Sequence, residues 1–205
     1  VKQDEPSEDN SSVYLVFERL NTGGLQLQPQ EIRSAIFAGK FVDLLKEMNE
    51  FPKWRNVYGG VSKRLKDQEF ILRFLAMYFY RQKYEKPLKG FLNKFMGKNR
   101  DLQLFSKQEL TSVFERTISF VEGTLGKNAF RPKRAINASI FDSVMVGLAV
   151  RMSERNKAPD AQEFLRAYEE LLRNKDYLQA TTSGTSDESS VVSRMDLAID
   201  AFSKI

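Results

Sequence analysis

The sequence predicts an all-α fold, an irregular multi-helix bundle of about eight helices. Apolar residues recur at three- and four-residue spacing through most of the 205 residues, and the alternation typical of strands is almost absent. No internal repeat of fixed period is visible, which argues against a solenoid. The 16 phenylalanines, against one tryptophan, further indicate a core rich in packed aromatic rings.

The first eleven residues stand apart from this pattern. Residues 1–3 are compatible with the end of a remnant strand, and residues 4–11 form a polar, largely acidic loop. The chain starts at Val1, and no signal-like segment follows. We therefore expect the natural N-terminus to lie upstream. The expected division is a remnant with its loop at residues 1–11 and one helical domain at residues 12–205.

Helices in the first quarter are marked by apolar spacing and by their ends. Residues 12–20 place apolar side chains on one face, and a glycine pair should stop this helix. Pro29 is suited to the first turn of a second helix, which we expect to end at Gly39. A third helix is predicted at about residues 41–49.

The next stretch is harder to interpret because proline and glycine interrupt it. Residues 50–66 are expected to be irregular, with Trp54 anchoring them to the core. The strongest helical periodicity follows at residues 67–80. Both faces of this helix are apolar, so residues 77–80 should be core. A Lys-Pro pair then breaks the chain before a lysine-flanked helix at about residues 88–96.

Helix starts in the second half carry clear capping signals. A Ser or Asp followed three residues later by Glu forms a capping box at Ser106 and at Asp160. Another helix should begin near Asn137. Residues 181–190 are rich in Ser, Thr and Gly and predict a linker. The helices expected here are 106–124, 137–148, 160–174 and 190–202.

Composition excludes several kinds of site. The chain has no cysteine and no histidine, which excludes disulfides, cysteine-based zinc sites, a cysteine nucleophile and a Ser-His-Asp triad. Any chemistry would depend on carboxylates, lysines or backbone amides. The acidic pairs Asp67/Glu69 and Glu169/Glu170 are expected on solvated helix faces or at helix starts rather than at a metal. We nominate no catalytic residue and no metal ligand.

Basic residues gather in two stretches of a chain whose net charge is +5. Residues 81–100 hold seven cations and one acid, and residues 127–134 hold four cations and no acid. Such patches can bind phosphate backbones through counterion release, although they can also serve only to keep an apolar helix soluble. Phe91 and Phe95 have the i, i+4 spacing of a buried face rather than of a stacking platform. The candidate DNA contacts are Lys89, Lys94, Lys98, Arg100, Arg131, Lys133 and Arg134.

The segment FERLNTGG at residues 17–24, continuing to QEIR at residues 30–33, is the most informative motif. It predicts a helix, a glycine-rich turn and a second helix that begins at a proline. Backbone amides at such a turn can bind an anion. The spacing matches neither the P-loop nor the dinucleotide-binding fingerprint. From the residues alone, a tight helix–turn–helix corner without a ligand is the competing interpretation.

This motif resembles the hallmark of the GmrSD restriction endonuclease N-terminal-domain family, a ParB/sulfiredoxin-like group of bacterial defence proteins. Further segments fit the same family and extend the resemblance over nearly the whole chain: DLLKEMN at 43–49, QEFILRFLAM at 68–77, LKGFLNKFM at 88–96, INASIFDSVMVGLA at 136–149 and SRMDLAIDAF at 193–202.

The resemblance implies an upstream α/β subdomain with an Asp-Gly-Gln-Gln-Arg motif, which this sequence lacks. NTP and Mg²⁺ would then belong to the full-length protein, which would be a cytoplasmic NTP hydrolase or DNA endonuclease. This chain would hold no cofactor and would contact the upstream subdomain, DNA and a second copy or another defence protein. The residues implied to form the wall of the upstream pocket are Arg19, Asn21, Thr22, Gly23, Gly24, Gln30, Glu31 and Arg33.

A second interpretation comes from a different functional class. The chain would be a non-catalytic helical module for protein interaction or dimerisation, and its basic stretches would only confer solubility. DNA binding at moderate salt separates the two interpretations.

Overall fold

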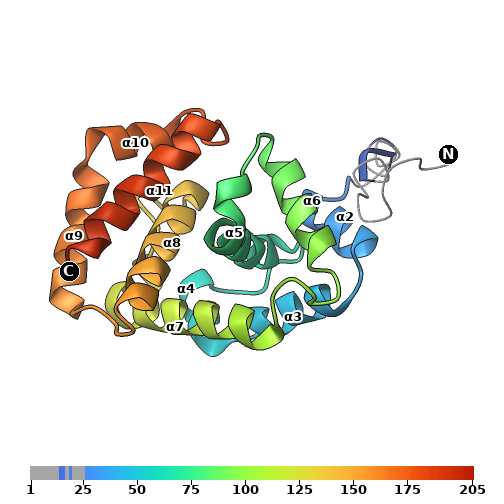
Figure 1. The fold of residues 1–205 in the computed structure, drawn as a ribbon, viewed down its shortest axis with the longest axis horizontal. Helices are drawn as coiled ribbons and strands as arrows, with labels where there is room; N and C mark the ends of the chain where they lie inside the picture. The colour runs from blue at the N-terminus through green and yellow to red at the C-terminus, as the bar shows by residue number, and fades with distance from the viewer. Residues whose placement is uncertain (1–13, 17–18, 20–25) are drawn as a thin grey trace.

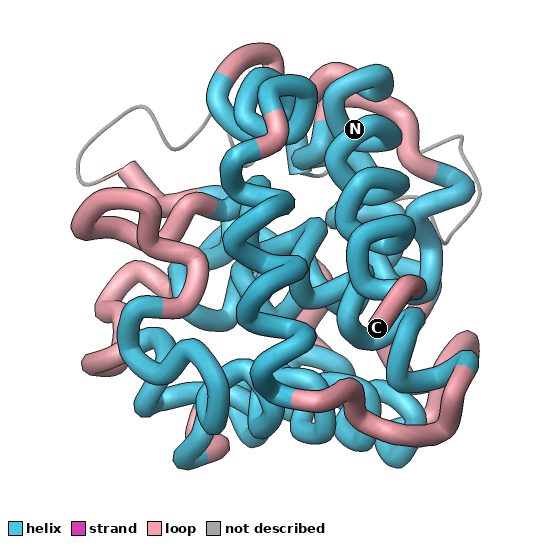
Figure 2. Tube along the Cα trace, turned by 90° about the vertical axis from the view of Figure 1, so that its left-hand side faces the viewer, coloured by secondary structure: helices cyan, strands magenta, loops and turns pink. Residues whose placement is uncertain are grey.

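The computed structural model describes residues 14–16, 19 and 26–205. Helices and loops make up this part, and it contains no strand (Figure 2). The predicted all-α class is therefore confirmed. The α-helices are α2 (Pro29–Ile36), α3 (Lys40–Asn49), α4 (Pro52–Tyr58), α5 (Lys66–Tyr80), α6 (Leu88–Lys98), α7 (Lys107–Leu125), α8 (Ala138–Glu154), α9 (Ala161–Arg173), α10 (Lys175–Thr182) and α11 (Glu188–Ser203).

Two expectations for the N-terminal region have different outcomes. Residues 14–16 and 19 are helical, as expected for the helix at 12–20. The strand expected at residues 1–3 lies outside the described residues, and so does the boundary between residues 11 and 12. The described part holds ten α-helices from α2 to α11, somewhat more than the eight or so expected, and two 3-10 helices, η1 (Arg81–Lys83) and η2 (Gly126–Asn128).

Helix α5 lies at the centre of the molecule and packs against α3, α6, α7 and α8. Figure 1 shows α8 to α11 gathered at one end and α2, α3 and α6 at the other. Helix α7 runs along one edge between the two ends. The most extensive contact between two helices joins α8 to α11.

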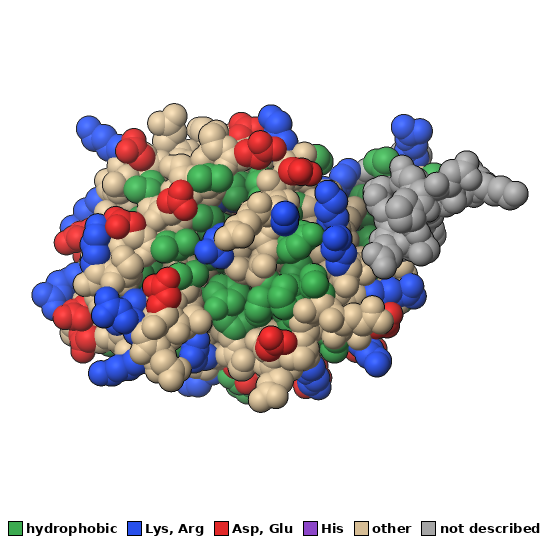
Figure 3. Space-filling model, in the orientation of Figure 1, with side chains coloured by type: hydrophobic (Ala, Val, Ile, Leu, Met, Phe, Trp, Pro, Cys, Tyr) green, Lys and Arg blue, Asp and Glu red, His purple; other side chains and the backbone are tan. Residues whose placement is uncertain are grey.

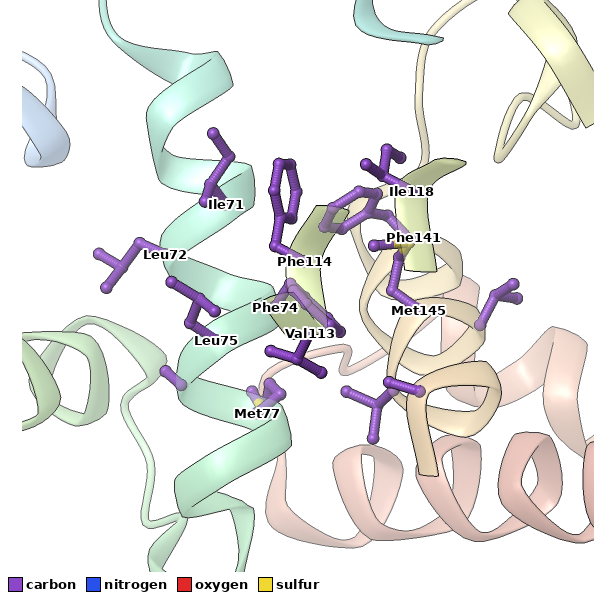
Figure 4. Packing of buried hydrophobic residues seen from close by; sticks show 14 of the residues in the cluster. Ile71, Leu72, Phe74, Leu75, Met77, Val113, Phe114, Ile118, Phe141 and Met145 are labelled. Carbon is purple, nitrogen blue, oxygen red and sulfur yellow. The ribbon is translucent and has the colours of Figure 1, made fainter. Parts of the chain in front are cut away.

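The core forms where α5, α7 and α8 meet. In Figure 4, Phe74 of α5, Phe114 of α7 and Phe141 of α8 point toward one another, with aliphatic side chains around them. All three rings are buried. Helix α8 is apolar on nearly every side and is buried along most of its length, as expected for a central helix. The predicted aromatic core is therefore confirmed.

The region expected to be irregular, residues 50–66, contains helix α4, so that part of the prediction was wrong. Pro52 occupies the first turn of α4, where its missing N–H costs nothing. Trp54 is fully buried and its Nε1 donates to Asn49 Oδ1 at 3.0 Å. Its predicted role as an anchor is confirmed. Pro52 begins a short helix here instead of breaking one. The presence of a proline does not by itself show which of the two it does.

The predicted helix caps are confirmed, whereas the predicted end of the second helix at Gly39 is wrong. Ser106 and Glu109 form the reciprocal capping box of α7. Asp160 caps α9 and Asn137 caps α8 through side-chain oxygens. Helix α2, however, ends at Ile36. Gly39 is an extended residue before α3, and a Cβ there would lie 2.9 Å from Arg100 Cγ. The glycine is needed for that close approach rather than for a helix end.

Residues 181–190 were expected to be a linker, and only part of that segment is non-helical. Helix α10 extends to Thr182 and α11 begins at Glu188, which leaves a five-residue turn at 183–187. Arg194 Nη1 donates to the Thr185 carbonyl (2.6 Å), and Tyr84 Oη donates to the Ser186 carbonyl (2.7 Å). Tertiary hydrogen bonds therefore fix a segment whose composition is typical of a flexible linker.

The expectation that residues 77–80 belong to the core holds fully for the first of them and in part for the other three, which pack against the core. Met77 is buried, but Tyr78, Phe79 and Tyr80 are each partly exposed. Their rings continue a chain of aromatic contacts that reaches Phe105. The ring centroids of Phe79 and Phe105 lie 4.4 Å apart.

Within the described part of the chain, no helix combines the length and the apolarity that a membrane span requires.

Candidate functional site

The residues expected to wall a pocket are only partly within the described structure. Asn21, Thr22, Gly23 and Gly24 lie outside the described residues, and Arg19 is helical. The remaining three belong to α2 and take part in hydrogen-bond networks: Gln30, Glu31 and Arg33.

Arg33 ties α2 to two other helices. Its side chain is 2% exposed. Its Nε donates to Asn93 Oδ1 of α6 (2.9 Å), and its Nη1 donates to Glu69 Oε2 of α5 (2.9 Å) and Gln30 Oε1 (3.1 Å). Gln30 is also buried, and its Nε2 has no hydrogen-bond acceptor among the described residues. Arg33 therefore joins α2 to α5 and α6, and Gln30 supports Arg33 from within α2.

Glu31 has a different set of partners at the start of α2. Its Oε2 accepts from the backbone N–H of Gln28 (2.6 Å), which closes a capping box, and from Nε of Arg64 (3.0 Å). Arg64 also donates to the carbonyl of Gln26. Glu31 thus fixes the entry to α2 and holds the loop that precedes α5.

The lysines nominated for DNA binding on α6 do not share one face. Nine residues separate Lys89 from Lys98, which is about half a turn out of register on a helix. Lys89 Nζ lies 5.5 Å from the centre of the Tyr14 ring, and Lys98 Nζ lies 6.0 Å from the centre of the Tyr80 ring. Lys94 and Lys98, four residues apart, are exposed on the same side.

Two further lysines lie near Lys94. They belong to the basic stretch at residues 81–100 but are not among the candidate DNA contacts. Lys83 and Lys86 line a hollow of about 170 Å³ together with Lys94. One acid, Glu85, also lines the hollow and lies 3.5 Å from Lys94 Nζ, and Lys86 Nζ lies 3.6 Å from Asp187. Such exposed pairs are worth only about 0–1 kcal/mol. Figure 3 shows basic side chains spread over this face of the molecule, some of them beside a central apolar patch.

Arg100 and Arg131 use much of their hydrogen-bonding capacity within the protein. Arg100 Nε donates to the carbonyl of Ala38 at 2.8 Å. Arg131 donates to carbonyls at the end of α4 and in its own turn. The other two nominated residues of this loop, Lys133 and Arg134, are exposed. This loop and α6 belong to different parts of the fold, because the loop is fixed to the end of α4 whereas α6 packs on α2 and α5.

The predicted burial of Phe91 and Phe95 is confirmed. Both rings face the core and are almost inaccessible to solvent. Phe95 packs against Phe41 at 5.7 Å and Phe91 against Tyr84 at 5.0 Å. Neither ring is available for stacking on a nucleic-acid base.

Sequence reasoning missed a buried ionic cluster around Asp142 of α8. Arg73 of α5 makes two hydrogen bonds to this carboxylate, from Nε at 3.0 Å and from Nη2 at 2.5 Å. Nη2 of Arg194 lies 3.7 Å from the same carboxylate, and both Asp142 and Arg194 are fully buried. Burial opposes the charge on Arg73, but Asp142 outweighs it and raises the pKa of Arg73. Burial lowers the pKa of Arg194. Asp142 raises it, but from a greater distance than at Arg73, so the effect of burial prevails.

These charges alternate in sign through the molecule. Glu69 lies between Arg33 and Arg73, since it pairs directly with Arg33 and interacts electrostatically with Arg73. The series therefore connects α2, α5, α8 and α11. The sequence signal was an aspartate within an otherwise apolar helical segment, which indicates a paired charge but does not identify its partner.

The acidic pairs considered for metal binding have other partners. Asp67 is buried and pairs with Arg55 at 2.9 Å, whereas Glu69 pairs with Arg33. Glu169 pairs with Arg173 one turn further along α9. Among the described residues, no group of three or more carboxylates is placed to hold a metal ion.

No protein-family model, no curated protein and no solved structure matches this chain.

Proposed function

We propose that the chain is the helical portion of a GmrSD-like bacterial defence protein and that it binds DNA through the basic side of α6. The family assignment rests on the FERLNTGG and QEIR motifs and the segments that accompany them. In the full-length protein, the helical domain would contact an upstream NTP-hydrolysing or DNA-cleaving subdomain.

The observation that carries DNA binding is the group of lysines around the hollow at the start of α6. Lys83, Lys86 and Lys94 line the hollow, and Lys98 is exposed one turn beyond Lys94. Lys86 and Lys94 form only solvent-exposed ion pairs, at 3.6 Å and 3.5 Å. Lysines in such a setting remain available to phosphate oxygens, and the binding they support weakens with salt. Lys89 is not included, because it lies over Tyr14 on another side of the helix.

Fluorescence anisotropy with a labelled duplex at several salt concentrations tests this proposal. We expect the variant carrying Lys83→Ala, Lys86→Ala and Lys94→Ala to bind more weakly than the wild type. The slope of log K against log salt should decrease by roughly one unit for each phosphate that the variant no longer neutralises. A matched variant removes the same charge from exposed positions at the other end of the molecule: Lys157→Ala, Lys175→Ala and Lys204→Ala. Equal slopes for the two variants would refute the proposal.

A second candidate function, a protein-interaction module, is favoured by a different surface. A hollow of about 260 Å³ between α5, α7 and α8 includes the partly exposed rings of Tyr78 and Phe79. Partly exposed aromatic rings beside a hollow are common in protein interfaces. This function predicts that the wild type fails to bind duplex at moderate salt and self-associates in sedimentation velocity.

A further inference from the structure

A second basic hollow, separate from the one at the start of α6, lies where the end of α4 meets η2. Its volume is about 400 Å³, within the roughly 300–1,000 Å³ typical of small-molecule sites. The residues that line it include three cations and no carboxylate: Arg55, Asn56, Val57, Tyr58, Gly59, Lys127 and Arg131.

Arg131 is held rigidly in the wall of this hollow. Its Nη1 donates to the carbonyls of Val57 (2.9 Å), Lys127 (2.7 Å) and Ala129 (3.2 Å), and its Nη2 donates to that of Tyr58 (3.0 Å). Carbonyls at the C-terminal end of a helix repel anions. Here two of them face a guanidinium, and within the described structure no carboxylate pairs with that guanidinium. Its positive charge therefore remains uncompensated at the hollow.

Arg55 is positioned with similar precision from the opposite side. Its Nη1 donates to Asp67 and its Nη2 to Asn49, each at 2.9 Å. The guanidinium carbon lies 5.3 Å from the centre of the Tyr58 ring. Asp67 is fully buried and also accepts from Asn49 and the backbone of Ser62, so it fixes Arg55 from within the core. Arg55 is thus held in place before any ligand binds.

Lys127 contributes a cation whose amino group has no hydrogen-bond or ion-pair partner within the described part of the chain. Glu122, which Asn56 of the lining contacts at 3.2 Å, is also engaged by Lys53 at 2.8 Å. Because Asp67 balances Arg55, the excess positive charge of the hollow comes from Arg131 and Lys127. Exposed Lys133, further along the same loop, adds to that excess.

The mouth of the hollow is open along the turn that ends α4. A Cβ built at Gly59 or at Gly60 would meet no atom within 4 Å. Gly59 has a φ of 107°, which other residues adopt only with strain. The turn is therefore not covered by other side chains at these two glycines.

We infer that this hollow is a phosphate-binding site formed by Arg55, Lys127 and Arg131. The fixed guanidinium of Arg131 attracts phosphate oxygens through its charge, and the ammonium of Lys127 supplies donors that the protein does not use. The phosphate is that of a free nucleotide or of a nucleic-acid backbone. The inference is independent of DNA binding by α6, since the two sites share no residue.

Two-dimensional ¹H–¹⁵N NMR of the whole chain tests the inference with inorganic phosphate, ATP and a short oligonucleotide as separate probes. We expect the amide signals of Gly59 and Gly60 to shift, while those of Gly90 and Gly97 on α6 stay unchanged with inorganic phosphate and ATP. Lys127→Glu should weaken phosphate binding by about tenfold or more, as expected when one charge-assisted hydrogen bond is removed. Lys157→Glu, an equal charge change at an exposed loop, should have no effect.

The three probes also identify the source of the phosphate. Tighter binding of ATP indicates a free nucleotide, and tighter binding of the oligonucleotide indicates a nucleic-acid backbone. The variant with Lys83, Lys86 and Lys94 replaced by alanine should retain the shifts at Gly59 and Gly60 even if duplex binding is absent. The inference fails if no probe shifts these two signals, or if Lys127→Glu binds as tightly as Lys157→Glu.

Discussion

Asp142 lies between Arg73, which is 11% exposed, and the fully buried Arg194, and is the only carboxylate that the described structure pairs with either of them. Asp142→Asn keeps the shape of the side chain but removes the charge that compensates both guanidiniums. Breaking a buried ion pair in this way costs about 3–5 kcal/mol. We therefore expect a large drop in the urea midpoint of unfolding, followed by far-ultraviolet circular dichroism.

A matched substitution at the surface separates this effect from a general loss of charge. Asp43 pairs with Lys46 on α3, and both side chains are mostly exposed. Asp43→Asn should change the free energy of unfolding by less than about 0.5 kcal/mol. Similar destabilisation of the two variants would contradict this prediction. It would show that solvent, and not Asp142, compensates the charges of the two arginines.

The sequence identified charged residues correctly but could not identify their partners. Arg33 bonds to Asn93, 60 positions away, and Arg73 to Asp142, 69 positions away. Local patterns carry no information on such pairs. Arg131 was therefore predicted to contact DNA, although its hydrogen bonds go to backbone carbonyls of the protein. Its charge remains relevant to the phosphate site, but its donors are largely occupied.

At the scale of elements, α8 and α11 pack closely enough to require a glycine. A Cβ on Gly147 would lie 2.8 Å from the carbonyl carbon and oxygen of Ala198 and 3.0 Å from Phe202 Cδ2. Gly147→Ala improves helix propensity by about 1 kcal/mol, but pushing α11 outward costs roughly 1–3 kcal/mol. We expect a net loss of stability, measured as a lower urea midpoint.

Gly123 on α7 provides the control for this substitution. It is exposed, and a Cβ there would meet nothing within 4 Å. Gly123→Ala should stabilise the protein by about 0.5–1 kcal/mol, since only the propensity effect remains. A stabilising Gly147→Ala would show that α8 and α11 are less closely packed than in this structure.

Elements with strong local signals were predicted, and elements that depend on tertiary contacts were not. The capping box at Ser106 located the start of α7, because capping is a local hydrogen-bond pattern. Helix α4 was missed because its seven residues are held mainly by Trp54, whose ring contacts α5, α7 and α8. The turn at 183–187 was missed for a related reason, since its bonds come from Tyr84 and Arg194.

At the scale of the whole molecule, periodicity was enough to predict the all-α class but not the arrangement of the helices. The sequence does not show that α5 lies at the centre or that α8 and α11 form the largest contact. It also does not show that residues 81–100 and 127–134 belong to separate surfaces. Both basic stretches supplied candidate DNA contacts, and in the fold they line separate hollows.

The stability of the molecule as a whole should be nearly independent of pH between about 6 and 9. The chain has neither histidine nor cysteine, the side chains that commonly titrate in that range. On the acid side, hydrogen bonds from Ser106 lower the pKa of Glu109, and those from Lys53 and Asn56 lower that of Glu122. Their stabilising effect is complete above the ordinary carboxyl pKa and is lost as the pH falls through the lowered values.

On the alkaline side, burial raises the pKa of four tyrosines above 10.0: Tyr58, Tyr84, Tyr168 and Tyr177. A raised tyrosine pKa favours the neutral form in the folded state. The resulting stabilisation is fully present below pH 10 and decreases as the pH rises from there toward the raised values. The melting temperature, measured by differential scanning calorimetry, should be level from pH 6 to 9 and fall above about pH 10. Tyr177→Phe should make that alkaline fall shallower. A step in melting temperature between pH 6 and 8 would instead require a carboxylate or lysine with a strongly shifted pKa.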